Sequence, residues 1–231
     1  MELSIIIPAY NEAGSIAAVL EEIPSIPRSE TIVVDGGSVD GTAEIAREHR
    51  ALVVTETKLG YGRACAAGVD AAAGVVCVFL DADGADDPSY IPQLYQSLRA
   101  EAADLVLGSR LAAGIAYGAM PWHQRAGNLL AVMLINQLYR CNLTDLSPMR
   151  AVKREKLATL GMREMTYGWP TEMIVKAARA NWGIIEVPVI YRARVAGRSK
   201  ISGTFHGTCL AAYHIFATIL RSSRVPNQDF P

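Results

Sequence analysis

The stretch VFLDADGADDP, residues 78–88, carries four aspartates directly after a run of apolar residues. The apolar run, Val75 to Leu80, is typical of a strand that is buried on both faces. Carboxylates this close together repel one another unless a cation or several hydrogen-bond donors lie among them. The stretch therefore predicts a buried strand with a charged site at its end. The four side chains of that site are Asp81, Asp83, Asp86 and Asp87.

On either side of this stretch, apolar runs alternate with helical patterns. Strands are predicted at residues 3–7, 31–34, 52–55, 75–80 and 104–107. Helices are predicted at residues 13–23, 63–73 and 90–99, with a further turn and helix at 37–49. Asp40 or Thr42 is the candidate N-cap of the helix within residues 37–49. This alternation indicates βαβ units, and hence an α/β fold with a mostly parallel sheet covered by helices on both faces.

Polar side chains follow each of the first four predicted strands. In sheets of this kind, ligands bind in the crevice outside the carboxyl ends of the strands. We therefore predict one binding site along this edge of the sheet. The side chains expected there are Asn11, Glu12, Asp35, Lys58, Asp81 and Asp83.

The second half of the chain has a different organisation. Helical patterns are predicted at residues 124–139, 171–180 and 206–221, and residues 142–150 are polar and loop-like. A strand at 184–190 contains Pro188, which favours a position at the edge of the sheet. Between this strand and the last helix lies the basic segment YRARVAGRSKISG, residues 191–203.

Composition limits the classes of function. Hydrophobic residues make up 51% of the 231 residues, which is enough for a buried core. The net charge of −1 argues against a nucleic-acid partner. The widely spaced cysteines form no CxxC pair, so we expect reduced thiols in a cytoplasmic protein. We also expect no signal peptide and no membrane span. The cysteines are Cys65, Cys77, Cys141 and Cys209.

The pair Asp81 and Asp83 has the spacing of a metal site. Mg²⁺ prefers oxygen ligands and commonly takes one or two carboxylates together with substrate phosphates. An Asp-x-Asp at a strand end therefore suits Mg²⁺ or Mn²⁺ carrying a diphosphate. The alternative is structural: Asp83 and Gly84 would form a turn, and Asp86 and Asp87 would cap the next helix.

Several motifs in order resemble a known family. SIIIPAYNE, VVDGGSVDGT, KLGYGRA and FLDADGADDP resemble the nucleotide-sugar half of family 2 inverting glycosyltransferases, which have the GT-A fold. LGSR, RAGN, TDLSPMR, the EM of PTEM and RVAGRSK resemble the dolichyl-phosphate mannose synthase branch, whose members are polyprenyl-phosphate glycosyltransferases. The resemblance implies a catalytic domain over residues 1–203, with a donor half at 1–110 and an acceptor half at 111–203. A C-terminal helix and tail would occupy residues 204–231.

The resemblance also implies roles for individual residues. Asp81 and Asp83 would bind the Mg²⁺ or Mn²⁺ ion, and Asp35 would contact the base or ribose. The full set expected around the nucleotide sugar is Pro8, Tyr10, Asn11, Glu12, Asp35, Lys58, Gly60, Asp81, Ala82 and Asp83. The basic residues expected to act with Asp83 in catalysis, by holding donor and acceptor phosphates, are Arg110, Arg125, Arg194 and Lys200.

The sequence departs from the family pattern at three places. Gly36 stands where many members have a second aspartate. Ala85 stands where some members have a glutamine that binds the metal, so water, Asp86 or Asp87 would complete the coordination. Pro148 replaces a glycine in the TDLSPMR segment and stiffens a loop of the expected acceptor pocket.

The expected reaction is the inverting transfer of a hexose, from GDP-mannose or UDP-glucose, to a polyprenyl or dolichyl phosphate. Such a phosphate is already largely dianionic at neutral pH, so it needs positive charge rather than a general base. Asp145 and Glu172 are expected to orient sugar hydroxyls or basic side chains. The terminal helix could pack on the core or lie on the cytoplasmic face of a membrane. A membrane subunit or a second copy of the chain is also a possible partner.

Other functions stay open at this point. A transferase acting on a glycan or small-molecule hydroxyl would need a positioned carboxylate base, and the QxxRW motif of processive enzymes is absent. A nucleotidyltransferase also pairs aspartates with metal, but it usually has a Gly-rich basic loop where this chain has PAYNE. The GYGRAC stretch lacks the third glycine of a dinucleotide-binding loop. A nucleotide-sugar-binding module without activity is the remaining alternative.

Overall fold

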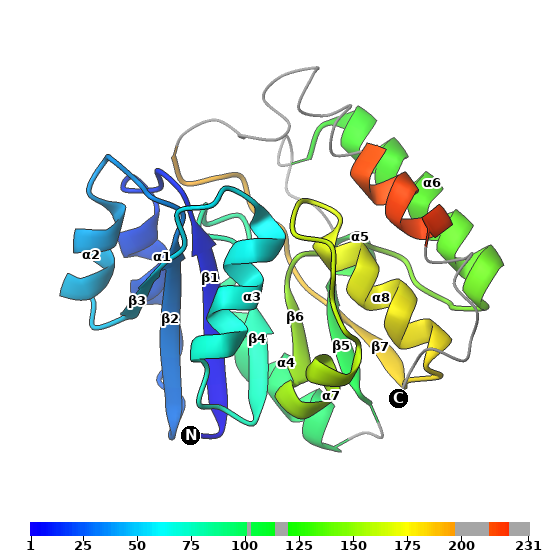
Figure 1. The fold of residues 1–231 in the computed structure, drawn as a ribbon, viewed down its shortest axis with the longest axis horizontal. Helices are drawn as coiled ribbons and strands as arrows, with labels where there is room; N and C mark the ends of the chain where they lie inside the picture. Colours follow the sequence, from blue (N-terminus) through cyan, green and yellow to red (C-terminus); the bar gives the residue numbers. More distant parts are fainter. Residues whose placement is uncertain (101–102, 114–119, 197–212, 222–231) are drawn as a thin grey trace.

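The structure is a computed structural model that describes residues 1–100, 103–113, 120–196 and 213–221. Within these residues, a seven-stranded sheet has the strand order β3-β2-β1-β4-β6-β5-β7 (Figure 1). All neighbouring strands are parallel except β6, which runs antiparallel to β4 and to β5. The strands are β1 (Leu3–Ala9), β2 (Ser29–Asp35), β3 (Leu52–Thr55), β4 (Val76–Phe79), β5 (Leu105–Ser109), β6 (Arg150–Lys153) and β7 (Ile184–Pro188).

Helices cover both faces of this sheet. One hydrophobic cluster joins the sheet to α1, α2 and α4. A second cluster joins the other face to α3, α6 and α8, with α6 on the outer side of α8 (Figure 1). The helices are α1 (Ile16–Glu22), α2 (Thr42–Glu48), α3 (Tyr61–Ala71), α4 (Ile91–Ala100), α5 (Arg110–Ala113), α6 (Trp122–Tyr139), α7 (Arg154–Thr159) and α8 (Trp169–Arg179), with a 3₁₀ turn η1 (Pro88–Tyr90). Residues 213–221 are also helical.

The two helical layers explain why the strands are apolar throughout. In β4, Val76 and Val78 belong to the cluster with α1 and α4, whereas Cys77 and Phe79 belong to the cluster with α3 and α8. Successive side chains of a strand point to opposite faces, so both sets are buried. The α/β class and the mostly parallel sheet predicted from the sequence are therefore confirmed.

The main correction concerns residues 150–159. They form β6 and α7, whereas the sequence predicted only a loop that ended at Arg150. β6 is four residues long and has a basic residue at each end, so it carries no strand pattern of its own. It pairs with β4 and β5, which are distant in the sequence, and this pairing makes it a strand. The edge position predicted from Pro188 is correct, because β7 is the last strand of the sheet.

The predicted N-cap of α2 was wrong. Gly41 is the N-cap, in a left-handed conformation with φ of 91°, and the helix begins at Thr42. Asp40 instead bridges two loops: Oδ1 accepts from the backbone N–H of Thr42, and Oδ2 accepts from that of Ala13. The carboxylate therefore ties the start of α2 to the segment after β1.

Two further expectations concern membranes and thiols. No helix in the described parts of the chain combines the length and the apolar character needed to cross a bilayer. Cys65, Cys77 and Cys141 are free thiols. Cys209 and residues 206–212 of the predicted terminal helix lie outside the described residues.

Candidate active site

The four aspartates of residues 78–88 lie after β4, which is the middle strand of the sheet. Asp83 and Asp86 are buried, with exposures of 4% and 2%, and Asp81 is half-buried. Burial, and then the negative charge of Asp83, raise the pKa of the Asp81 carboxyl well above its usual range. Burial, and then the charges of Asp81 and Asp83, raise the pKa of Asp86 further. The three carboxyl groups therefore interact strongly.

The basic segment after β7 lies along this aspartate loop. The backbone N–H of Arg192 donates to the carbonyl of Ala85, and that of Val195 donates to the carbonyl of Asp83. Gly84, with φ of 76°, allows the contact, because a Cβ there would lie 2.5 Å from Cγ2 of Val195. Two segments more than a hundred residues apart in the sequence therefore form one wall of the site.

Two arginines carry positive charge to the carboxyl cluster. Arg194 Nη2 lies 2.7 Å from Oδ2 of Asp83. Arg110 donates from Nε and Nη2 to the two oxygens of Asp145, at 2.7 and 2.8 Å, and its guanidinium lies 5.0 Å from the ring centre of Tyr191. Burial alone would lower the pKa of Arg110, but the bonds to Asp145 raise it above the usual value, so the side chain keeps its charge. Asp145 thus orients a basic side chain, as the sequence predicts.

The structural alternative for the later aspartates is half correct. Asp87 caps η1 by accepting from the N–H of Ser89 at 3.0 Å, and it also pairs with Arg192. Asp86 is no cap. Its Oδ2 accepts from the N–H of Asp81 at 3.2 Å, while its buried Oδ1 has no hydrogen-bond partner in the structure.

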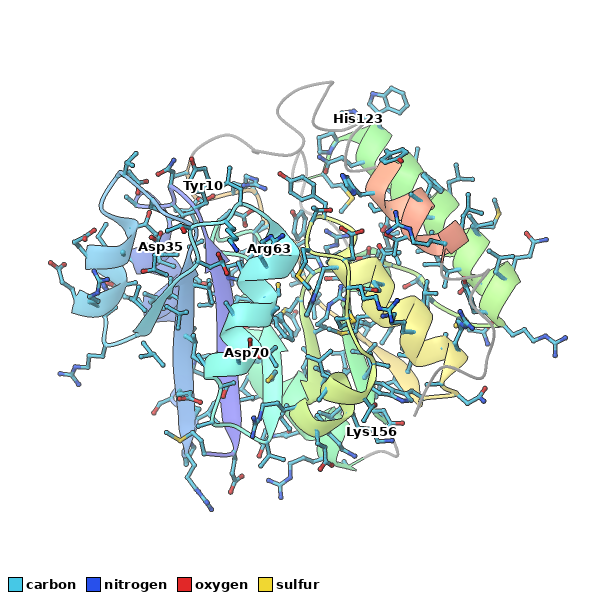
Figure 2. All side chains as sticks on the ribbon, viewed as in Figure 1. Tyr10, Asp35, Arg63, Asp70, His123 and Lys156 are labelled. Carbon is cyan, nitrogen blue, oxygen red and sulfur yellow. The ribbon has the colours of Figure 1, made fainter. Side chains whose placement is uncertain are left out.

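The residues predicted to line the nucleotide lie at the same end of the sheet. Tyr10 and Asp35 are found there with Arg63 near the start of α3, whereas Asp70 lies farther along α3 (Figure 2). Asp35 is buried and accepts from the N–H groups of Gly37 and Ser38, so it shapes the loop after β2. Asn11 binds the same loop: its N–H donates to Oγ of Ser38 at 2.8 Å.

The other predicted residues of the donor side have varied surroundings. Pro8 is half-buried in β1, and Glu12 donates its N–H to Oγ1 of Thr42 at 2.8 Å. Lys58 is exposed, and Ala82 is buried between the two aspartates. Gly60 has φ of 148°, and a Cβ there would lie only 2.3 Å from the carbonyl oxygen of Met165, so no larger residue fits.

Not every predicted residue is brought into the cluster. Arg125 lies on α6 with its side chain exposed. Lys200 lies outside the described residues. Glu172, expected to orient sugar hydroxyls or basic groups, pairs with Lys176 at 2.9 Å and accepts from the N–H groups of Arg163 and Glu164. It therefore holds the loop before α8.

Sequence reasoning missed Tyr61, the first residue of α3. Its hydroxyl donates to Oδ1 of Asp81 at 3.1 Å. Burial, followed by the charge of Asp81, raises the pKa of Tyr61, so the phenol stays protonated and remains a donor. The residue stands in the KLGYGRA motif, but no spacing in the sequence links it to an aspartate twenty positions later.

The site fits a divalent cation that arrives with its substrate. In the described ranges, no set of three or more His, Cys, Asp or Glu side chains is arranged to hold a metal. Two carboxylates with a deficit of positive charge are nevertheless what Mg²⁺ or Mn²⁺ uses when phosphate oxygens complete its coordination. The unpartnered Oδ1 of Asp86 is a further sign that the cluster lacks a cation or donor.

Comparisons with known proteins agree with this geometry. The family model described as Glycosyl transferase family 2 matches residues 4–161. An uncharacterised glycosyltransferase of Mycobacterium tuberculosis is 38% identical over 218 residues, which is 94% of this chain and 97% of that protein. A dolichyl-phosphate hexose transferase of Haloferax volcanii is 36% identical, with coverage of 87% and 86%. An undecaprenyl-phosphate mannosyltransferase of Micrococcus luteus is 32% identical, with coverage of 90% of each chain.

A solved structure supports the same assignment. Glucosyl-3-phosphoglycerate synthase from Mycobacterium tuberculosis, in complex with Mn²⁺, uridine diphosphate and glucosyl-3-phosphoglycerate, matches with a TM-score of 0.76 and 26% identity. The match covers 98% of this chain and 81% of that chain. The predicted GT-A fold is thereby confirmed. The motifs, the sheet and the relatives lead to one conclusion: the chain belongs to glycosyl transferase family 2 and is a glycosyltransferase.

Proposed function

We propose that the protein transfers a hexose from a nucleoside diphosphate sugar to the phosphate of a polyprenyl chain, with inversion at the anomeric carbon. Mg²⁺ or Mn²⁺ would be held by Asp81 and Asp83. The observation that carries the proposal is the cluster of three interacting carboxyl groups after β4, faced by Arg194 and Arg110. This combination suits a metal-bound diphosphate and a second anion beside it.

On the donor side, the metal ion would neutralise charge on the leaving diphosphate when bound. Tyr61 orients one of its carboxylate ligands, Asp81. Arg194 pairs with Asp83 in the structure. With a metal ion held at that carboxylate, the guanidinium of Arg194 would be free to bind a phosphate oxygen. Most of the rate enhancement would then come from position and charge.

On the acceptor side, a phosphate nucleophile needs no general base, because its second pKa is about 6. It needs cations that hold it close to an anionic donor. Arg110 is kept charged and rigid by Asp145 and Tyr191, and we propose Arg125 and Lys200 as further phosphate-binding residues. The names of the Haloferax volcanii and Micrococcus luteus relatives include a polyprenyl phosphate acceptor, which supports this choice.

GDP-mannose and UDP-glucose are the two donors that we propose. The Micrococcus luteus relative is named as a mannosyltransferase. Structures of glucosyl-3-phosphoglycerate synthase include complexes with uridine diphosphate and with UDP-glucose. Gly36 stands where many family members have a second aspartate, in the segment expected to contact the nucleotide base. Guanosine and uridine donors should therefore both be assayed.

A second candidate function is transfer to a hydroxyl of a phosphorylated small molecule. It is favoured by the similarity to glucosyl-3-phosphoglycerate synthase, one structure of which is a complex with phosphoglyceric acid. Such an acceptor would need a general base. Asp86 has a raised pKa, but at 2% exposure it is poorly placed to take a proton from an incoming hydroxyl.

The test is an assay of radiolabelled transfer. GDP-mannose and UDP-glucose are each offered with Mn²⁺, with a short-chain polyprenyl phosphate and, separately, with phosphoglyceric acid. We expect a lipid-linked product that EDTA abolishes. Asp83→Asn should lower its formation at least about 100-fold, the scale seen when one group that stabilises transition-state charge is lost. It should also remove metal-dependent donor binding in calorimetry.

Asp70→Asn is the matched control, since Asp70 is exposed and lies away from the strand ends (Figure 2). It should leave transfer unchanged. If the sugar were transferred only to phosphoglyceric acid, and not to the polyprenyl phosphate, the second candidate function would replace the proposal. Unaltered transfer by Asp83→Asn would show that the metal site is misplaced.

A further inference from the structure

Helix α6 is apolar on two opposite sides. One side packs into the core through Ala131, Val132 and Ile135, which are buried. The other side faces solvent, with Trp122 80% exposed and Met133 61% exposed. We call this side the outer face of α6. At 3.6 residues per turn its members fall on one stripe: Trp122, Ala126, Leu129, Leu130 and Met133.

An exposed apolar stripe of this kind marks a surface that contacts another protein or a membrane. The charged residues around the stripe indicate which of these partners it contacts. The sequence has no Asp or Glu between Asp104 and Asp145, and none between Glu186 and Asp229, although the chain as a whole carries a net charge of −1. Among the described residues of α6, the residue that follows it and the segment 213–221, the exposed charged side chains are Arg125, Arg140 and Arg221. In this described part of the chain, the surface is therefore apolar at its centre and basic at its margins.

The helical segment 213–221 is a neighbour of α6 with a similar composition. It lies beside α6 (Figure 1), and the hydroxyl of Tyr139 donates to the carbonyl of Ile219 at 2.9 Å. Within the segment 213–221, Ile219 is buried, whereas Tyr213 and Leu220 are exposed. Two neighbouring helices thus present exposed aromatic and aliphatic side chains, with no acidic residue on either.

We infer that the outer face of α6 is a docking surface for a bilayer that contains anionic lipids. Aromatic and aliphatic side chains that insert at the headgroup level, flanked by arginines, are the composition of interfacial helices. The position is suitable too, because His123 at the start of α6 lies at the same end of the molecule as Tyr10 (Figure 2). The inference rests on the proposed function, since an acceptor held in that bilayer would present its phosphate near the strand ends.

The experiment uses the full chain and vesicles of phosphatidylcholine with or without phosphatidylglycerol, without donor or acceptor. The wild-type protein should co-sediment with the anionic vesicles, less so at high salt, because screening weakens the contribution of the arginines. Its tryptophan emission should shift to the blue. Trp122→Phe should lose most of that shift while still sedimenting, because Trp169 is buried and Trp182 is half-buried.

The double variant Leu129→Gln/Met133→Gln should lower vesicle binding at least about tenfold, given the transfer free energy of two apolar side chains. Val75→Gln is the control: Val75 is 60% exposed but precedes β4, at the other end of the strands. It should bind vesicles as the wild type does. Circular dichroism melting checks that each variant is folded, and Trp122→Ser gives an independent single change on the same face.

Failure of the wild type to bind anionic vesicles, or equal binding by the folded double variant, would overturn the inference. So would a dimer in sedimentation velocity that the double variant abolishes while vesicles bind neither protein, because the face would then contact a second copy. Transfer to a short-chain acceptor in detergent is measured separately. Vesicle binding without such transfer would reject the proposed function and retain the docking surface.

Discussion

At the scale of single residues, the contact between Arg194 and Asp83 is central to the proposed donor site. The guanidinium lies 2.7 Å from a carboxylate that would bind the metal, so arginine and metal compete for the same oxygen atoms. Arg194→Gln should therefore raise the affinity for Mn²⁺ alone by about threefold, a modest factor because the arginine is partly exposed. The same change should lower the rate of transfer. Electron paramagnetic resonance of free Mn²⁺ measures the first effect, and steady-state assays measure the second.

Arg192→Gln is the matched control for this prediction. Arg192 also bonds carboxylates, but its partners are Glu22 and Asp87. Its substitution should leave the Mn²⁺ affinity unchanged. A fall in Mn²⁺ affinity on removing Arg194 would mean that the arginine supports the metal site instead of competing for it.

Tyr61 provides a second prediction at this scale. Its hydroxyl is a donor to Oδ1 of Asp81, and a hydrogen bond to a charged group is worth about 1.5–3 kcal/mol. Tyr61→Phe should weaken metal-dependent donor binding about tenfold without unfolding the protein. Tyr95→Phe is the control, because Tyr95 also donates to a carboxylate. That carboxylate belongs to Glu2, which precedes β1 and so lies at the opposite end of the strands from the site. Calorimetry with Mn²⁺ and nucleoside diphosphate would contradict the prediction if both variants bound equally.

At the scale of elements, the start of α3 depends on the loop before α8. The N–H groups of Gly62 and Arg63 donate to the carbonyls of Thr166 and Met165, at 3.2 and 3.1 Å. These are orphan donors of the first turn, so the loop replaces a side-chain cap. The same loop contacts the helical segment 213–221 through Thr166 Oγ1 and Nδ1 of His214. Donor side and C-terminal helix are thus joined through one loop.

Gly62→Ala should disturb this junction. A Cβ at Gly62 would lie 2.5 Å from the carbonyl oxygen of Glu164 and 2.8 Å from backbone atoms of Met165. Overpacking against a backbone costs about 1–3 kcal/mol. The free energy of unfolding in urea should fall by that amount, and donor affinity should fall with it, because Tyr61 would move away from Asp81.

Gly127→Ala separates this effect from helix propensity. Gly127 lies in α6 with nothing within 4 Å of an added Cβ. The alanine should stabilise the protein by about 0.5–1 kcal/mol, as in an exposed helix interior. Equal stability changes in the two variants would mean that the loop before α8 does not press on α3.

At the scale of the whole molecule, the candidate site joins parts that are distant in the chain. The ends of β1, β2 and β4 meet the start of α3 and residues 191–195 around the carboxyl cluster. A ligand that bridges these parts stabilises the native state by mass action, by about 2.7 kcal/mol at 100 times its Kd. For a chain of this size the melting temperature should rise by about 5 °C or more.

The effect should need both components. Mn²⁺ alone and nucleoside diphosphate alone should give small shifts, because each leaves charge in the site uncompensated. Their combination should give the full shift, and EDTA should reverse it in differential scanning fluorimetry. A full shift from the nucleotide in the presence of EDTA would contradict a metal-bridged site.

Much of the site was predictable from the sequence for a simple physical reason. Parallel strands that are buried on both faces appear as apolar runs, and their carboxyl ends meet at one edge. Asp35 and the pair Asp81 and Asp83 could therefore be placed together without a structure. The order of PAYNE, KLGYGRA and FLDADGADDP was enough to identify the family, which the comparisons then showed.

Only the tertiary structure decided which side chains meet across the chain. β6 became a strand through its partners β4 and β5, Tyr61 reached Asp81 through the packing of α3, and Arg194 reached Asp83 because residues 191–195 lie along the aspartate loop. The sequence by itself determined the fold class and the edge at which the ligand would bind, because apolar periodicity and turn chemistry are local. The pairing of charges depends on contacts between distant segments, and no local pattern records those contacts.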